Sequence, residues 1–168
     1  EDASMNKELV RLLLRQFISD VMELPKAINA VNEIIGGEGM SRTLEFKCST
    51  LSGGLCCGPA LVSGEAVCFY LVEPDTGVVV EKGHVLEGKS MEGKVLVAHA
   101  GKGSSVVQMD GLFKISRKGK APVGVVLRNP DPVFVSALLV MEIPSVYAVE
   151  DAFFDTVKDG QAVEMDAD

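Results

Sequence analysis

Near the middle of this 168-residue chain, an apolar run passes directly into a glycine-rich turn. Residues 94–100 read Lys-Val-Leu-Val-Ala-His-Ala, and residues 101–105 read Gly-Lys-Gly-Ser-Ser. The apolar run predicts a buried strand, and residues 106–118 predict a helix that ends at Gly119. A strand that leads directly into a helix brings free backbone N–H groups and two hydroxyls to one point. Such a turn can bind a carboxylate or phosphate, or it can be a plain serine-capped connection.

The rest of the chain after Met40 is dominated by short strand patterns. Apolar residues alternate there or form brief continuous runs, and turn signals separate them, the strongest being residues 73–77, Glu-Pro-Asp-Thr-Gly. Strands first and strand–helix alternation later predict a compact mixed α+β domain over residues 40–168, barrel-like, with helices packed outside. The other strands expected are residues 44–48, 60–62, 65–72, 78–80, 123–127, 145–148 and 162–165, with a second helix at 132–141.

Residues 1–39 have a different periodicity and predict an N-terminal helical extension. Between residues 10 and 22, apolar side chains recur every three or four positions. Pro25 ends this helix and suits the first turn of another, which Gly36 and Gly37 end. The apolar stripe is explained either by core packing or by docking on a partner protein.

Charge and hydropathy exclude two classes of partner. The chain carries 16 Lys and Arg against 24 Asp and Glu, a net charge of −8, with no basic cluster. Binding to nucleic acid needs clustered positive charge, so no nucleic-acid partner is expected. The apolar runs are far shorter than the ~20 residues that cross a bilayer, and no signal peptide precedes them. We therefore expect a cytoplasmic protein with no membrane partner.

The cysteines do not predict a metal site on this chain. They are Cys48, Cys56, Cys57 and Cys68. Their spacing fits neither zinc nor iron–sulfur patterns, which need Cys-x2-Cys or similar, and only His84 and His99 could add nitrogen ligands. Reduced, mostly buried thiols are expected instead.

Several short motifs stand in a fixed order between residues 41 and 166. They are Gly58-Pro-Ala-Leu-Val-Ser63, Val72-Glu-Pro-Asp-Thr-Gly77, His84-Val-Leu-Glu-Gly88, Gly93-Lys-Val-Leu-Val97, Gly101-Lys-Gly-Ser-Ser105 and Lys120-Ala-Pro122. In this order and spacing, they resemble the small subunit, or swivelling domain, of the aconitase X family. The chain departs from the family at Tyr70 and Leu71, where two glycines are common, and at Val85, where proline is common.

The resemblance implies a swivelling β/β/α fold and a hydro-lyase that removes water from a hydroxy acid. The family's activities imply 5-phosphomevalonate as the slightly favoured substrate and cis-3-hydroxy-L-proline as the next. The expected partner is a large subunit that carries an iron–sulfur cluster, and the enzyme is active only in that complex.

The resemblance also implies roles for the residues of the glycine-rich turn. Ser104 corresponds to the serine that takes the proton next to the substrate carboxylate. Its anion needs stabilisation, which the amides of Gly103–Ser105, a helix N-terminus and the charge of Lys102 can supply. Substrate binding is expected from Lys102, Gly103 and Ser105. Two of these have alternatives: Lys102 can lie in solvent, and Ser105 can cap the helix.

Other functions are weighed against this one. In a phosphocarrier swivelling domain, His99 would accept the phosphate, but the Gly-Gly-x-Thr stretch expected before it is missing. His99 is interpreted rather as a core histidine of the buried strand, although it and His84 are also candidate acid–base groups. Met109 and Phe113 are expected in the helix core. A third possibility is a non-catalytic subunit that only stabilises its partner.

Overall fold

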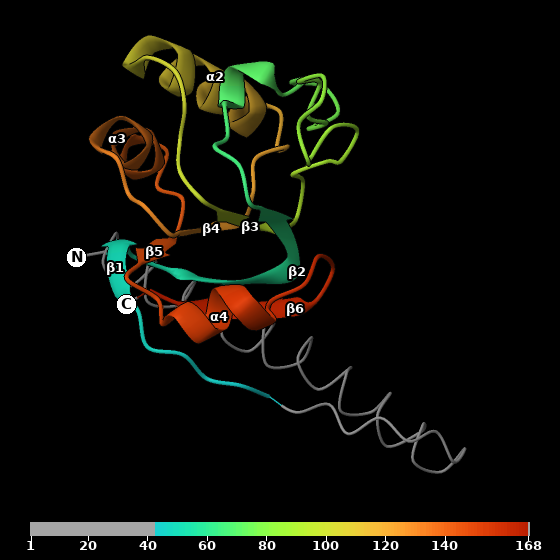
Figure 1. The fold of residues 1–168 in the computed structure, drawn as a ribbon. Coiled ribbons are helices and arrows are strands. Elements are labelled where there is room, and N and C mark those ends of the chain that lie inside the picture. Colours follow the sequence, from blue (N-terminus) through green and yellow to red (C-terminus); the bar gives the residue numbers. More distant parts are fainter. Residues whose placement is uncertain (1–42, 168) are drawn as a thin grey trace, which may run out of the picture. The chain divides into compact units, whose positions relative to one another are not determined.

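The protein's structure is a computed structural model that describes residues 43–167, and residues 46–167 belong to one compact unit. The predicted helices within residues 1–39 lie outside the described residues. Within these, a curled six-stranded sheet has the order β1-β5-β4-β3-β2-β6 (Figure 1). Strands β2 to β5 are parallel and neighbour one another in chain order, while β1 and β6 run antiparallel at the edges. The strands are β1 (Ser49–Ser52), β2 (Leu55–Ser63), β3 (Val95–Ala98), β4 (Gly124–Leu127), β5 (Ser145–Tyr147) and β6 (Ala162–Asp166).

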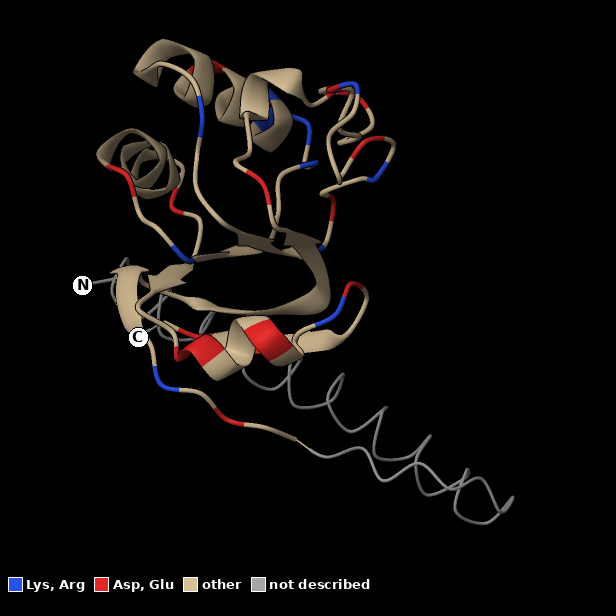
Figure 2. Cartoon of the chain, in the orientation of Figure 1, with Lys and Arg blue, Asp and Glu red and all other residues tan. Residues whose placement is uncertain are grey.

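Helices cover both faces of the sheet. α2 (Ser105–Arg117) joins β3 to β4, and α3 (Pro132–Val140) joins β4 to β5. Because crossovers between parallel strands are right-handed, both helices lie on the same face, as Figure 1 shows. The short α4 (Asp151–Thr156) crosses the opposite face on the way from β5 to β6 and carries acidic residues (Figure 2). None of the helices in the described part of the chain has the length and apolarity to cross a membrane.

The sheet separates two apolar cores because side chains alternate along each strand. In β3, Leu96 and Ala98 join the core under α2 and α3, whereas Val95 and Val97 join the core under α4. All four are at most 2% exposed. A strand covered on both faces reads as a continuous apolar run, which explains why the sequence signal of β3 is strong.

The predicted mixed, barrel-like fold is confirmed, and so are most of its elements. The strand at 94–100 is β3, the helix at 106–118 is α2, the strand at 123–127 is β4 and the helix at 132–141 is α3; the strands at 60–62, 145–148 and 162–165 fall in β2, β5 and β6. The turn at 73–77 is also confirmed, because the amide of Gly77 donates to the carbonyl of Glu73 at 2.8 Å.

The predicted strand at 65–72 is wrong. After an isolated bridge at Val67, the chain forms a 3-10 helix, η1 (Phe69–Leu71). The apolar character of this run comes from burial rather than from strand pairing, since Phe69 is fully buried and its ring stacks on that of Phe134 at 4.9 Å between centroids.

Two shorter predicted strands are also wrong. Residues 44–48 form no strand, and five of the six residues 43–48 are exposed, because β5 pairs with the chain only from Ser49 onward. Within residues 78–80, only Val78 and Val79 pair in β-bridges with other segments, and each makes a single isolated bridge. The helix α4 was not predicted, because its six residues are too few to show a helical period.

Candidate functional site

The glycine-rich turn follows β3 directly and is held against the start of α3. The amide of Gly101 donates to Oδ2 of Asp131 at 3.2 Å, and Oδ1 of Asp131 accepts from the amides of Val133 and Phe134, the first turn of α3. A Cβ atom at position 101 would lie 2.5 Å from the Phe134 ring, so only glycine fits there. One carboxylate therefore caps α3 and anchors the turn.

Ser104 stands at the N-cap position of α2, and its hydroxyl makes no capping hydrogen bond. Of the two alternatives for Ser105, a helix cap or a substrate-binding hydroxyl, the cap does not hold, because Ser105 is the first residue of the helix. Both serines are exposed. Gly103, with φ of 107°, supplies the backbone conformation that turns the chain into the helix.

The first turn of α2 leaves backbone donors at the surface. Gln108 is the first residue whose amide reaches a helical carbonyl, that of Ser104 at 3.0 Å. The amides of Ser105, Val106 and Val107 precede it and have no carbonyl partner within the helix. Together with the helix dipole, these donors create a partly positive region beside the Ser104 hydroxyl, which favours an anion or a developing alkoxide.

Lys102 is fixed at its backbone and paired at its side chain. Its amide donates to the carbonyl of Val67 at 3.0 Å, and its carbonyl accepts from Nε2 of Gln108 at 2.8 Å. Its ammonium forms an ion pair with the carboxylate of Glu81. Lys102 had been expected to contact substrate or to lie in solvent. The structure shows a carboxylate of the same chain beside it.

Gln108 holds the turn together from within the core. Its side chain is 1% exposed, and Nε2 also donates to the carbonyl of Val67, while Oε1 accepts from the amide of Phe69. Sequence reasoning missed Gln108, Glu81 and Asp131. For Gln108 a signal exists, since it is an amide on the otherwise apolar inner face of α2, and a buried amide needs partners.

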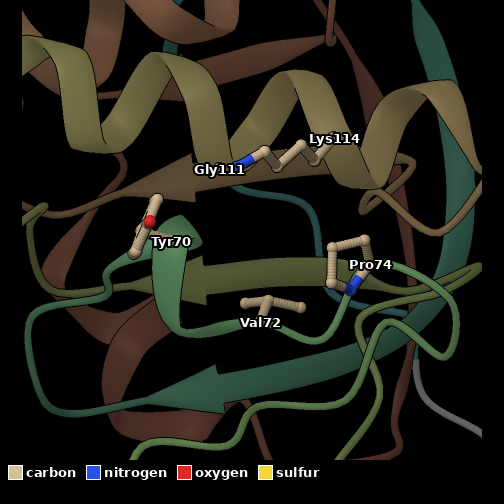
Figure 3. A pocket seen from close by; sticks show the side chains of 5 residues that line it. All are labelled: Tyr70, Val72, Pro74, Gly111 and Lys114. Carbon is tan, nitrogen blue, oxygen red and sulfur yellow. The ribbon is translucent and has the colours of Figure 1, made fainter.

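A small pocket lies about two turns further along α2. Its volume is about 230 Å³, and Figure 3 shows the residues that line it, which are Tyr70, Val72, Pro74, Gly111 and Lys114. The Lys114 ammonium lies 5.1 Å from the centre of the Tyr70 ring, and a hydrogen bond to Asp110 raises the pKa of this lysine. Tyr70, one of the departures from the family pattern, is 54% exposed here. None of the residues that line the pocket belongs to the glycine-rich turn.

The two histidines have opposite environments. His99 is exposed, and its Nε2 lies 3.2 Å from the side-chain Nδ2 of Asn129. The interpretation of His99 as a core histidine is therefore wrong, because this residue follows the last buried residue of β3. His84 is buried, and its ring joins the carbonyl of Ala66 to the amide of Leu86. Met109 packs against the core, but Phe113 is 49% exposed, which contradicts its predicted core position.

The cysteines are free thiols, and only Cys56 and Cys68 are buried. Burial, and then the neighbouring Cys57, raise the pKa of Cys56 to about 12. Within the described residues, no group of three or more His, Cys, Asp or Glu side chains is placed to bind a metal ion. These residues therefore do not fit an iron–sulfur cluster.

Comparison with known proteins gives matches that agree in family and cover about three quarters of the chain each. The family profile described as "Aconitase X swivel domain" matches residues 45–168. The phosphomevalonate dehydratase small subunit of Methanocella arvoryzae is 36% identical over 124 residues, which cover 73% of this chain and 93% of that protein. That of Methanothrix thermoacetophila is 38% identical, covering 74% and 90%. The crystal structure of Thermococcus kodakaraensis aconitase X superimposes with a TM-score of 0.68 at 28% identity, covering 74% of this chain and 93% of that one.

Proposed function

The chain belongs to the aconitase X family as a swivel domain, and from this we propose that it is the small subunit of a phosphomevalonate dehydratase. Relatives of this name match at 36% and 38% identity and align over nine tenths or more of their own length. The proposed reaction is the removal of water from 5-phosphomevalonate, a hydroxy acid that carries a phosphate.

The observation that supports this function best is the exposed Ser104 hydroxyl at the uncapped start of α2. In the proposed reaction, Ser104 Oγ takes the proton from the carbon next to the substrate carboxylate. The electron pair released forms the double bond as the C–O bond of the adjacent carbon breaks; the leaving hydroxide takes up one proton to become water, and Ser104 returns to its starting state by releasing the proton it took, so that one water is removed overall. A serine oxygen needs stabilisation as an anion to act as a base, and the unpaired amides of the first helical turn provide it.

The other residues of the turn bind substrate in this proposal. Lys102 contributes a positive charge for a carboxylate or phosphate, and the amides of Gly103 and Ser105 contribute donors. The substrate therefore approaches the carboxyl end of β3, where these three residues and Ser104 lie.

The iron–sulfur cluster of the family belongs, in this proposal, to the large subunit. The described residues of this chain contain no set of ligands for it, and Cys56 is a poor ligand because burial keeps its thiol protonated. The small subunit then contributes the base and part of the substrate site, and neither chain is active alone.

The proposal is tested by producing the chain together with its large subunit under anaerobic conditions and measuring dehydration of 5-phosphomevalonate. Ser104→Ala is expected to lower kcat by at least about 10²-fold with little change in KM, because it removes the base and not a binding group. Ser105→Ala is the matched control and should retain most of kcat.

Three results would contradict the proposal in different ways. Turnover of cis-3-hydroxy-L-proline alone would assign the substrate to the other branch of the family. Full activity of the Ser104→Ala complex would make this chain a stabilising subunit. A mass increase of one phosphate on incubation with phosphoenolpyruvate or a phosphorylated donor protein, abolished by His99→Ala, would indicate a phosphocarrier.

A further inference from the structure

We propose that Glu81 is a positioning residue of this site, whose carboxylate holds the Lys102 ammonium where an anionic group of the substrate can reach it. The inference rests on the proposed dehydratase function, in which Lys102 binds substrate. Glu81 lies 21 residues before Lys102 and outside the glycine-rich turn, so the turn's sequence gives no hint of it.

The two side chains of the pair differ in exposure. The Glu81 side chain is 22% exposed and that of Lys102 is 39% exposed. The lysine side chain is therefore the more accessible of the two, and a negatively charged ligand that approaches from solvent has more access to Lys102 than to Glu81.

Both partners are attached to fixed backbone. Lys102 is held by the carbonyl of Val67 and the side chain of Gln108. Glu81 follows Val80, whose amide donates to the carbonyl of Leu71 at 2.9 Å, and the carbonyl of Glu81 accepts from the amide of His84. The ion pair thus joins two anchored segments rather than two mobile ones.

The chemistry of lysine makes such an arrangement useful for binding. An ammonium has three donors on a flexible four-carbon stem, and the free side chain samples many rotamers. The ion pair with Glu81 uses part of the hydrogen-bonding capacity of the ammonium and restricts the rotamers of the Lys102 side chain before substrate binds. Less conformational entropy of this side chain is therefore lost on binding. A partly exposed pair of this kind contributes little to stability, and in this proposal its role is in binding.

The test compares Glu81→Gln, Lys102→Met and the double variant in the assembled complex. Glu81→Gln keeps the shape and an acceptor oxygen but removes the charge. We expect KM for 5-phosphomevalonate to rise about tenfold in each single variant, and the double variant to be no worse than Lys102→Met alone, because both changes remove one function. kcat should change much less than KM.

Glu92→Gln is the matched control. Glu92 forms an ion pair with Lys120, with 2.7 Å between the charged atoms, and neither residue belongs to the glycine-rich turn. Its kinetic constants should equal those of the wild type. An unchanged KM in Glu81→Gln would overturn the proposal, and so would a lowered KM, which would show that Glu81 competes with the substrate for Lys102. Additive losses in the double variant would also count against it.

A second measurement separates this inference from the proposed function. Reductive methylation of the complex, followed by peptide mass spectrometry, reports the reactivity of the Lys102 ammonium without any turnover. Faster methylation of Lys102 in Glu81→Gln than in the wild type is expected. If the wild-type complex turns over neither substrate, the proposed function fails. Equal methylation rates of Lys102 in the wild type and in Glu81→Gln would overturn the positioning role, whether or not the complex is active.

Discussion

Gly111 lies in the middle of α2, where packing leaves no room for a side chain. A Cβ atom there would overlap the backbone of Phe69 and Tyr70 in η1. Glycine normally weakens a helix interior by about 1 kcal/mol relative to alanine. Its presence at this position is explained by the close approach of η1, which packs directly on the helix.

Gly111→Ala should therefore destabilise the protein in spite of the better helix propensity of alanine. Backbone atoms of η1 cannot move aside as a flexible side chain can, and overpacking of a core costs about 1–3 kcal/mol. Less the gain of about 1 kcal/mol in helix propensity, we expect a net loss of about 1–2 kcal/mol in the free energy of unfolding, measured by urea denaturation. Val106→Ala, at a residue of the same helix that is 74% exposed, should stay within about 0.5 kcal/mol. A Gly111→Ala protein as stable as the wild type would contradict the packing.

Cys56 makes the stability of the protein sensitive to alkaline pH. Burial raises the pKa of its thiol from 9.0 to about 12 in the folded state. Between these two values, the unfolded chain releases the proton and the folded chain keeps it, so the contribution of Cys56 to stability is complete below about pH 9 and falls as the pH rises toward 12. The loss in stability caused by Cys56→Ala should thus be smaller at pH 10.5 than at pH 8, as measured by urea midpoints.

The same thiol should resist alkylation while the protein is folded. Cys48 is exposed and should react with iodoacetamide at once, whereas Cys56 should react only after unfolding. Rapid labelling of Cys56 in the folded protein, located by peptide mass spectrometry, would contradict its burial.

For single residues, the sequence predicts those members of the site that are neighbours in the chain. Gly101, Lys102, Gly103, Ser104 and Ser105 are neighbours, so one motif contains all of them. Glu81, Gln108 and Asp131 reach the same turn from three other segments through single side-chain contacts. Apart from the amide of Gln108 on the apolar face of its helix, nothing in the single sequence identifies these contacts before the fold is known.

Among the elements, those buried on both faces were the easiest to predict. β3 and β4 are continuous apolar runs, and α2 and α3 have clear starts at Ser104 and at Asp131 followed by Pro132. The run at 65–72 is equally apolar but is buried as a bridge and a 3-10 helix, and periodicity cannot distinguish these from a short strand. α4 is too short to show a period at all.

The side chain of Gln108 connects α2 to η1, to Val67 and to the glycine-rich turn, and this supports a prediction about the packing of these elements. Gln108→Leu preserves the size of the side chain but leaves the amide of Phe69 and the carbonyls of Val67 and Lys102 without this partner. The Val67 carbonyl keeps the Lys102 amide as a donor, so two groups are left unpaired, and because each such group costs about 1–3 kcal/mol, a loss of about 2 kcal/mol or more is expected in urea denaturation. Gln161→Leu, at an exposed glutamine, should cost less than about 1 kcal/mol. Equal effects of the two substitutions would show that the Gln108 bonds are dispensable.

For the molecule as a whole, the position of a strand in the sheet predicts its resistance to opening. β3 and β4 are central, and all eight of their residues are buried, whereas β1 and β6 are edge strands with several exposed residues. Hydrogen exchange followed by mass spectrometry should show the slowest exchange in peptides covering 95–98 and 124–127, and faster exchange in 49–52 and 162–166. Uniform rates across the sheet would contradict this order.

The winding of the sheet has a consequence for how a reaction centre can be enclosed. In many parallel sheets, ligands enter a crevice where successive connections depart in opposite directions. Here β2, β3, β4 and β5 follow one another in a single direction, so the described strands contain no such reversal. Ser104 is exposed at the carboxyl end of β3, so in the proposed complex the large subunit would supply the opposite wall of the site, and shielding from bulk water would be a property of the assembly.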